Sequence, residues 1–181
     1  DGNPVYHVNH LLGFFSAFNP DAIKNTRFYK GSFPAEYGGR LSSVVDVRMN
    51  DGNRQEYHGN ISVGLLSARA NLEGPIVKDR SSFNVSVRRT WLDLITGTAL
   101  AVVNKNSSIK DVFGYHFFDI NAKLNHSFSD RSRAYLSFYM GQDAFRQGSK
   151  EKNGDSEDMF LWRWGNSVSY THLRAHETVL D

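Results

Sequence analysis

The sequence predicts a mainly β protein that contains part of a transmembrane β-barrel. Polar and apolar residues alternate in segment after segment between Tyr57 and Val168, as expected for strands with lipid on one face and water on the other. The connections between these segments are alternately short and long, which is typical of outer-membrane barrels. These two observations predict about six antiparallel strands of an incomplete barrel, preceded by a smaller α+β unit.

The first fifty residues predict that smaller unit. Asn19 followed by Pro20 is a helix-start signal, so we expect a short helix there. A strand is expected over residues 25–30, and a second, half-buried strand begins at Ser43. The polar linker Asp51-Gly52-Asn53 then predicts a domain boundary, with residues 1–53 before it and residues 54–168 after it.

The barrel strands follow from the alternation. They are expected over residues 57–65, 67–73, 82–91, 118–125, 133–140 and from 160 onward. Tight links are expected at 75–80 and 129–131, and long connections over 93–115 and 143–158. One face carries large aromatic residues that need either lipid or a second sheet to cover them: Phe83, Phe118, Phe138 and Trp162.

Composition excludes several classes of protein. The chain has 181 residues, no cysteine and a formal net charge of +2, so neither a disulfide framework nor nucleic-acid binding is expected. No apolar run approaches the ~20 residues of a membrane helix. His126 and Ser127 lie on opposite faces of a strand, so no nucleophile and base are brought together. We predict no enzyme activity, no metal site and no cofactor.

Two other kinds of β protein share the alternation. The first is a soluble sandwich or lipocalin-like barrel, such as a carbohydrate-binding or adhesin-like module that uses Trp162 and Trp164 as sugar platforms. The second is a passive porin, which the plug-like segment described next disfavours. Labelling of Phe83, Val85 and Val87 distinguishes lipid contact from a dry core.

Four segments resemble a known family in order and spacing. They are Asp1-Gly2-Asn3-Pro4-Val5-Tyr6, Asn19-Pro20-Asp21-Ala22-Ile23, Tyr29-Lys30-Gly31 and the run from Tyr37-Gly38-Gly39-Arg40 to Val47. Together they resemble the second half of the plug domain of TonB-dependent outer-membrane receptors. Asn9-His10-Leu11-Leu12 and Leu72-Glu73-Gly74-Pro75 look like the receptors of the Bacteroidota lineage. The resemblance covers about residues 1–167.

The resemblance implies energy-coupled import of a nutrient across the outer membrane of a Gram-negative bacterium. The substrates of such receptors include siderophores, cobalamin, oligosaccharides and peptides. The implied partners are outer-membrane lipid, the TonB-ExbB-ExbD complex acting through an N-terminal segment, and a surface-exposed substrate-binding lipoprotein. We expect this chain to be a fragment, with the C-terminal part of the plug and the first barrel strands, that neither inserts stably nor transports alone.

The last thirteen residues, 169–181, do not continue the alternation. The run Ser169-Tyr170-Thr171-His172-Leu173-Arg174-Ala175-His176-Glu177-Thr178 looks like a translated sequencing adapter. We expect native sequence to stop near Val168. His172 and His176 have the spacing of metal ligands on a helix, but they lie in this tail and are not expected to bind a metal.

Three groups of residues are candidates for function. In the family, the loop after the strand that resembles Asp1-Gly2-Asn3-Pro4-Val5 rises to the outer face of the plug, so His7, Asn9 and His10 are candidates for substrate contact, or for hydrogen bonds from plug to barrel wall. Contact between plug and barrel is also expected for Glu36 and Arg40, and surface exposure is the alternative. Arg69 and Arg88 are expected to form a lumenal basic strip, facing either an anionic substrate or the acidic residues of the plug.

Overall fold

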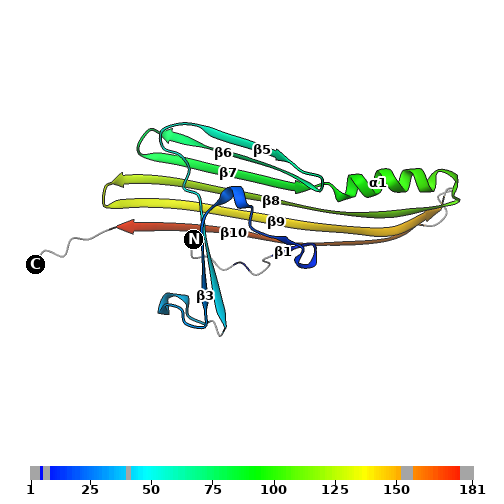
Figure 1. Cartoon of the computed structure of the whole chain (residues 1–181), viewed down its shortest axis with the longest axis horizontal. Helices are drawn as coiled ribbons and strands as arrows, with labels where there is room; N and C mark the ends of the chain where they lie inside the picture. The colour runs from blue at the N-terminus through cyan, green and yellow to red at the C-terminus, as the bar shows by residue number, and fades with distance from the viewer. Residues whose placement is uncertain (1–4, 6–8, 40–41, 152–156, 176–181) are drawn as a thin grey trace, which may run out of the picture.

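The chain folds as a mainly β protein with antiparallel sheets. The structure is a computed structural model, and it describes residues 5, 9–39, 42–151 and 157–175. Its largest sheet is a six-stranded meander in which each strand pairs with the next along the chain (Figure 1). Its strands are β5 (His58–Val63), β6 (Ser67–Val77), β7 (Ser81–Thr90), β8 (Ile109–Ser129), β9 (Ser132–Glu151) and β10 (Glu157–Ala175).

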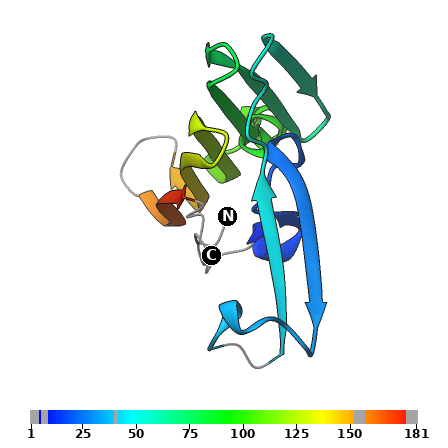
Figure 2. The same ribbon diagram turned by 90° about the vertical axis from the view of Figure 1, so that its left-hand side faces the viewer.

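The N-terminal part is a chain of short elements. They are β1 (Asn9–His10), η1 (Leu11–Gly13), β2 (Phe15–Ser16), η2 (Pro20–Ala22), β3 (Ile23–Lys30), η3 (Ala35–Tyr37) and β4 (Ser43–Met49). The predicted short helix at Asn19 is the 3₁₀ turn η2, whose first turn is capped by a hydrogen bond from Asp21 N to the Asn19 side chain, 3.2 Å. Strands β3 and β4 form a separate hairpin that projects away from the large sheet (Figures 1 and 2).

Two of the turns between strands lie at one end of the sheet. The β6–β7 turn and the β8–β9 turn both lie there, as predicted, and we call this the short-turn end. The opposite end differs from prediction, because β8 begins at Ile109 and β9 continues to Glu151, where loops were expected. Residues 109–115 and 143–151 pair with each other in register, so backbone hydrogen bonds extend the hairpin although its side chains no longer alternate cleanly.

One α-helix lies in the described part of the chain, and the sequence prediction missed it. Helix α1 (Leu92–Val103) and the following 3₁₀ turn η4 (Asn104–Asn106) connect β7 to β8. None of the residues of α1 is buried. The helix contacts the sheet only in part, as in the hydrogen bond from the Thr96 hydroxyl to the Phe113 carbonyl oxygen of β8, 3.0 Å. With no buried face it needs no continuous apolar stripe of the kind by which helices are recognised.

The two faces of the sheet are reversed relative to a soluble protein. Side chains paired across a ladder share a face, and one such row across the six strands reads Ile61, Ala70, Val87, Ile120, Met140 and Ser167. The next row, on the other face, reads Ser62, Arg69, Arg88, Asp119, Gly141 and Asn166. We call these the apolar face and the polar face.

Burial follows the polar face. On β7, Ser86 is fully buried and Arg88 nearly so, whereas Val85 and Val87 are 36% and 41% exposed. Seen along the strands, the sheet curves around the N-terminal elements (Figure 2). The polar face is therefore the packed side of the sheet, and the apolar face is the open side.

Strand β10 departs from this arrangement. Ser167 and Ser169 lie on the apolar face beside Met140 and Phe138, so the apolar surface ends at β9. Trp162 pairs with Phe145 and Trp164 pairs with Asp143, which puts both tryptophans on the polar face. The expectation that Trp162 shares a face with Phe83, Phe118 and Phe138 is therefore wrong.

The terminal segment is partly described. Residues 169–175 continue β10 and pair with 132–138 of β9. Strand β10 thus extends beyond Val168, where we expected native sequence to stop.

Two glycines allow a matched test of the linker that follows β4. Gly31 and Gly52 both have positive φ, +80° and +82°, but a Cβ on Gly31 would meet nothing within 4 Å, whereas one on Gly52 would clash with the Phe83 carbonyl oxygen. We expect Gly31→Ala to cost about 1 kcal/mol of unfolding free energy, from left-handed strain alone. Gly52→Ala should cost about 1–3 kcal/mol more, because the backbone must move.

Denaturant unfolding of the full chain measures both variants. Equal losses of stability would mean that the linker can shift away from β7 freely, and that the close approach at Gly52 does not constrain the fold.

Candidate functional site

The N-terminal segment, residues 9–22, lies against the polar face of the large sheet. Its contacts combine hydrogen bonds and ion pairs with apolar packing, in which Ala17 is fully buried and Phe15 lies against Phe117 of β8, with ring centroids 5.4 Å apart. Buried polar groups need hydrogen-bond partners, and burying an unpaired charge costs on the order of several kcal/mol. The question for each buried residue is therefore which partner it finds.

His10 is the centre of this contact. It is 3% exposed, and its Nδ1 lies 2.7 Å from Asp143 Oδ2 of β9. Its ring stacks on Phe117 of β8, with ring centroids 4.1 Å apart and planes inclined by 3°. Tyr115 donates a hydrogen bond to Asp143 and accepts one from the Leu11 backbone N–H, 2.7 Å. One histidine thus joins the N-terminal segment to two strands.

A buried ion pair adjoins His10. Arg88 Nη2 of β7 lies 2.6 Å from Asp119 Oδ2 of β8, and both side chains are almost fully buried. The same guanidinium donates to the Ser16 carbonyl oxygen, 2.7 Å, and lies 5.0 Å from the centroid of the Phe117 ring. His10 Nε2 is 3.7 Å from Asp119. The ion pair is therefore shared between the sheet and the N-terminal segment.

The second half of the segment makes two further contacts. The Asn19 side chain, 1% exposed, donates to the Ser86 hydroxyl of β7. Asp21 Oδ2 of η2 lies 2.9 Å from Arg69 Nε of β6. These contacts fix η2 over β6 and β7.

The linker after β4 carries a second group of charges. Asp51 pairs with Lys123 of β8 and with Lys24 of β3, both at 2.8 Å, and its backbone carbonyl accepts a hydrogen bond from Ser82, 2.7 Å. Burial alone raises the pKa of Asp51, but the hydrogen bonds and charges of the two lysines outweigh it and hold this pKa below its usual range. The folded chain therefore favours the ionised form of Asp51.

The structure places the predicted residues as follows. Asn9 is exposed in β1, and His10 makes the contact to the sheet that we gave as the alternative to substrate contact. Arg69 and Arg88 are neighbours across the β6–β7 ladder, and each pairs with a carboxylate, Asp21 and Asp119. His7 and Arg40 lie outside the described residues. Glu36 belongs to η3, and its predicted contact with the barrel also falls outside what the structure describes.

Sequence reasoning missed the partners of these residues. Asp143 was assigned to a loop, and Asp119, Lys123 and Tyr115 were read only as polar or unassigned positions. Alternate residues of a strand share a face, so Gly141 and Asp143 follow Tyr139 on the polar face if the strand continues past Met140. The choice of His10 as their partner depends on contacts more than a hundred residues apart, and no local pattern encodes it.

Aromatic side chains gather on the polar face beyond His10, toward the end opposite the short turns. Trp162 and Trp164 have ring centroids 4.9 Å apart, and Trp164 lies 6.4 Å from Tyr115. Phe145 contacts the rings of Phe113 and Phe160 edge-on. Phe160 and Trp162 are 59% and 54% exposed, so this aromatic surface is open to a ligand.

His126 finds a partner on the neighbouring strand. Its Nδ1 lies 2.7 Å from the Ser81 hydroxyl of β7. Within the described ranges, no group of three or more His, Cys, Asp or Glu residues is arranged to hold a metal ion. No helix in the same ranges is long and apolar enough to cross a membrane.

Comparison with known proteins gives no relative. No protein-family description, no curated protein and no solved structure matches this chain.

A double-mutant cycle tests the His10–Asp143 contact. We expect His10→Ala and Asp143→Asn each to lower the unfolding free energy by about 2–4 kcal/mol, because each leaves a buried polar partner unsatisfied. The double variant should lose less than the sum, with a coupling of about 1–3 kcal/mol. His58→Ala, at an exposed histidine of β5, is the control and should change little. Additive losses would contradict a direct interaction.

The Asp51 contact predicts a pH dependence of defined sign. Because the folded-state pKa of Asp51 is lowered, its ionised form stabilises the fold above its unfolded pKa of about 4, and this contribution disappears as pH falls through the folded pKa. Asp51→Asn should therefore destabilise the chain at pH 7, and the difference from the parent chain should shrink below pH 4. Denaturant unfolding across pH 2–7 measures it, and a difference that grows on acidification would refute the assignment.

Proposed function

We propose that the chain is part of an outer-membrane importer of the TonB-dependent type, with residues 1–53 as plug and the large sheet as part of the barrel wall. The observation that carries this proposal is the reversed sheet. Its polar face is buried beneath the N-terminal segment, and its apolar face has no cover among the described residues. Apolar surface on the open side of a curved sheet is stable in lipid and costly in water.

The height of the apolar face supports the same proposal. On β8 it extends from Phe118 to Phe128, interrupted by His126, and on β9 from Ala134 to Met140, after which Gln142 follows. The β8 stretch, 11 residues, matches the roughly 9–11 residues with which a tilted strand crosses a bilayer, whereas the β9 stretch spans seven. Strand β8 has 21 residues, so roughly half of it extends beyond the proposed membrane.

Aromatic residues border this apolar belt. Near the short-turn end Tyr57 covers Gly74 and contacts Phe83, with ring centroids 6.2 Å apart. At the other margin the Trp91 indole donates to the Leu65 carbonyl, 2.8 Å, close to where α1 begins. Tyrosine and tryptophan at the two margins of an apolar belt are typical of the interfacial girdles of membrane proteins.

The contact between the N-terminal segment and the sheet suits a plug that must hold and then move. His10, Asn19, Asp21 and Arg88 all bind through hydrogen bonds or ion pairs. Such bonds exchange for bonds to water when the surfaces separate, so the net cost of separation is smaller than the sum of the contacts. Energy coupling through a TonB protein would supply that cost in the proposed importer.

The aromatic surface around Trp162 lies on the substrate side of this arrangement. It occupies the polar face beyond the membrane belt, on the far side of His10 from the short turns. Exposed tryptophans bind sugars and other ligands with apolar faces. The same surface favours a second candidate function, a soluble carbohydrate-binding module, in which the apolar face would be covered by a second sheet.

Nitroxide labels distinguish the two functions. The chain has no cysteine, so Val85→Cys, Ser86→Cys and Val87→Cys each introduce one labelling site. In lipid bilayers we expect labels at Val85 and Val87 to be highly accessible to oxygen and poorly accessible to a water-soluble nickel chelate. The label at Ser86, which is fully buried under the N-terminal segment, should be inaccessible to both. Low oxygen accessibility at all three positions would favour the soluble module.

The importer part of the proposal is tested at the gene. Long-read sequencing through both ends of this reading frame should reveal upstream codons for a signal peptide, a TonB-binding segment and the first half of a plug, and downstream codons for further strands in place of residues 169–181. A native start near Asp1 and a native stop after Asp181 would overturn it.

A further inference from the structure

The aromatic surface beyond His10 is a regular array on the polar face. Three consecutive rows across β8, β9 and β10 read Phe117, Asp143 and Trp164; then Tyr115, Phe145 and Trp162; then Phe113, Gln147 and Phe160. Seven of these nine positions are aromatic. Phe117 and Tyr115 are buried at the corner beside His10, whereas Phe113 is 42% exposed and the β10 side of the array is open.

Carboxylates continue the same face beyond the aromatic rows. Asp111 pairs with Ser149 and Ser149 with Asp158, and Glu151 follows Ser149 by two residues. Alternate residues of a strand share a face, so all three carboxylates lie on the polar face. Each is exposed, and none forms an ion pair with another residue that the structure describes. We call Asp111, Glu151 and Asp158 the acidic rim.

The basic residues of these strands lie on the other face. Lys110 and Lys150 are opposite each other in the ladder, and Lys150 pairs there with Glu157, 3.2 Å. Arg146 and Arg163 also alternate with residues of the aromatic rows and therefore lie on the other face. In these rows, over the described residues 109–117, 143–151 and 158–164, the polar face carries no lysine or arginine.

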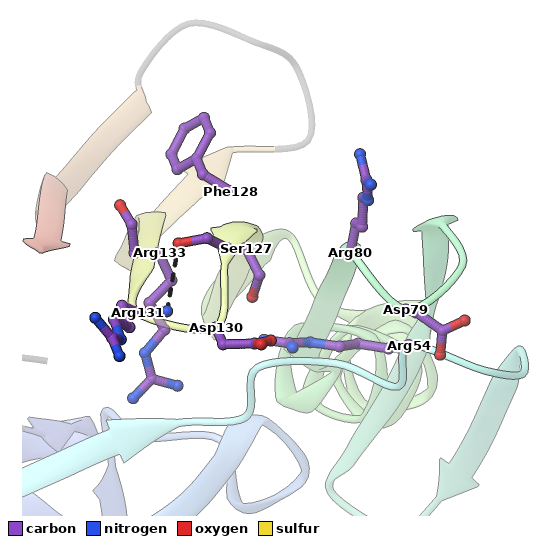
Figure 3. Close-up of a pocket in the computed structure, with 10 residues that line it drawn as sticks. Arg54, Asp79, Arg80, Ser127, Phe128, Asp130, Arg131 and Arg133 are labelled. Atoms are coloured by element: carbon purple, nitrogen blue, oxygen red, sulfur yellow. Dashed lines mark hydrogen bonds between the residues drawn. The ribbon is translucent and has the colours of Figure 1, made fainter. Parts of the chain in front are cut away.

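The short-turn end of the sheet has the opposite charge. Four arginines line a cavity of about 720 Å³ there, together with Asp79 and Asp130, and the side chains of Arg80 and Arg131 point apart (Figure 3). Positive groups thus gather at the short-turn end, and unpaired carboxylates gather beyond the aromatic surface. A cation is attracted to the acidic rim and an anion is repelled from it.

Arginine side chains match both parts of this surface. A guanidinium group stacks on the face of an aromatic ring, best on tryptophan, and it is weakly hydrated. The same group pairs with a carboxylate through two parallel hydrogen bonds. A neutral sugar could stack on the rings but would leave the carboxylates without a cation. The combination of open rings and unpaired carboxylates therefore favours guanidinium over sugar.

The spacing of the array indicates an extended ligand with more than one arginine. Asp111 and Asp158 stand on β8 and β10, two strand spacings or about 10 Å apart, so one guanidinium cannot pair with both. Successive rows are about 7 Å apart along the strands, which is also the distance between alternate residues of an extended peptide. A peptide that lies along the strands would place alternate side chains over successive rows.

We propose that the aromatic surface and the acidic rim together bind an extended, arginine-containing peptide, with guanidinium groups stacked on Trp162 and Phe160 and paired with Asp111 and Asp158. As a statement of substrate class this rests on the proposed function, because it makes cationic peptides the cargo of the importer. The binding itself depends only on β8, β9 and β10.

Calorimetric titration of the full chain in nonionic detergent micelles tests the proposal. The probes are the blocked peptide Ala-Arg-Ala-Arg-Ala, the same peptide with glutamine in place of arginine, and cellohexaose. We expect the arginine peptide to bind about tenfold more tightly than the glutamine peptide, from two ion pairs and ring stacking. Its binding should weaken as salt is added, because the carboxylates are exposed.

Variants locate the site. Asp111→Asn with Asp158→Asn should weaken binding of the arginine peptide about fivefold or more and leave the glutamine peptide unaffected. The matched control, Glu56→Gln with Asp130→Asn, removes the same charge from exposed positions elsewhere and should leave binding unchanged. Trp162→Leu keeps an apolar side chain but removes the ring, and should weaken binding about threefold. Circular dichroism of each variant establishes that the sheet is retained.

The tryptophans provide an independent readout. In a Trp91→Phe background, emission comes only from Trp162 and Trp164. The arginine peptide contains no aromatic residue, so a change in this emission on titration places the peptide at the aromatic surface. Calorimetric binding without any change in emission would contradict the assigned location.

The remaining results separate the site from the importer. Equal affinity for the arginine and glutamine peptides, or tighter binding of cellohexaose than of either, would overturn the peptide assignment. If the Val85 and Val87 labels show no contact with lipid but arginine-peptide binding still depends on Asp111 and Asp158, the importer is wrong and the peptide site stands. If the labels contact lipid and no peptide binds, the substrate class alone is wrong.

Discussion

The structure depends on the burial of a polar sheet face beneath the N-terminal segment. In most soluble folds an apolar face supplies the core, and its stabilisation grows with the area removed from water. Here the buried side chains include Arg88, Asp119, Asn121 and Lys123. Charges and amides are costly to bury unless each finds a partner. The N-terminal segment supplies several of those partners, so the fold of the sheet and the position of the segment are one problem.

This arrangement has a consequence for how the two parts separate. An apolar interface that opens exposes surface that water does not solvate well, whereas the groups around His10 and Arg88 can each be hydrated. The net contribution of one hydrogen bond is about 1 kcal/mol, much less than its strength in a dry interior. A contact built from such bonds is specific in geometry and moderate in free energy. That combination suits a segment that must be held in one place and later displaced.

The sequence was sufficient for the parts of the fold that local patterns determine. The alternation from Tyr57 predicted β5 and β7 to within one or two residues at each end, whereas β6 continues to Val77, four residues beyond its predicted end. The turns after β6 and β8 followed from their polar residues. It was insufficient where packing, or pairing between strands distant in the sequence, determines the secondary structure. Residues 143–151 contain Gln147, Gly148 and Lys150 and look like a loop, yet they form strand because 109–115 offers a partner. Helix α1 escaped prediction because its apolar residues cover no core.

The candidate site was also only partly predictable from the sequence. His10, Arg69 and Arg88 could be singled out from the sequence as polar residues in unusual positions, but Asp143 and Asp119 as their partners could not. Antiparallel register is set by every strand between them, so one insertion in β8 would bring a different residue to His10. The face of Trp162 was missed for a related reason. On β10 both faces carry polar and aromatic residues, and only the ladder with β9 shows that Trp164 shares a face with Asp143.

The linker after β4 connects the N-terminal part of the chain to the large sheet. Its side chains contact β6 and β8, Asn50 to Glu73 and Asp51 to Lys123, and the Asn50 backbone N–H also donates to the Ala22 carbonyl oxygen of the N-terminal segment, 2.8 Å. Displacement of residues 9–22 would break the bonds of His10, Asn19 and Asp21 and the bond between Asn50 and Ala22, while the side-chain contacts of Asn50 and Asp51 with β6 and β8 would keep the linker attached. The linker is therefore a fixed point from which residues 9–22 can separate, and separation would break their polar contacts and also expose the apolar contacts of Phe15 and Ala17.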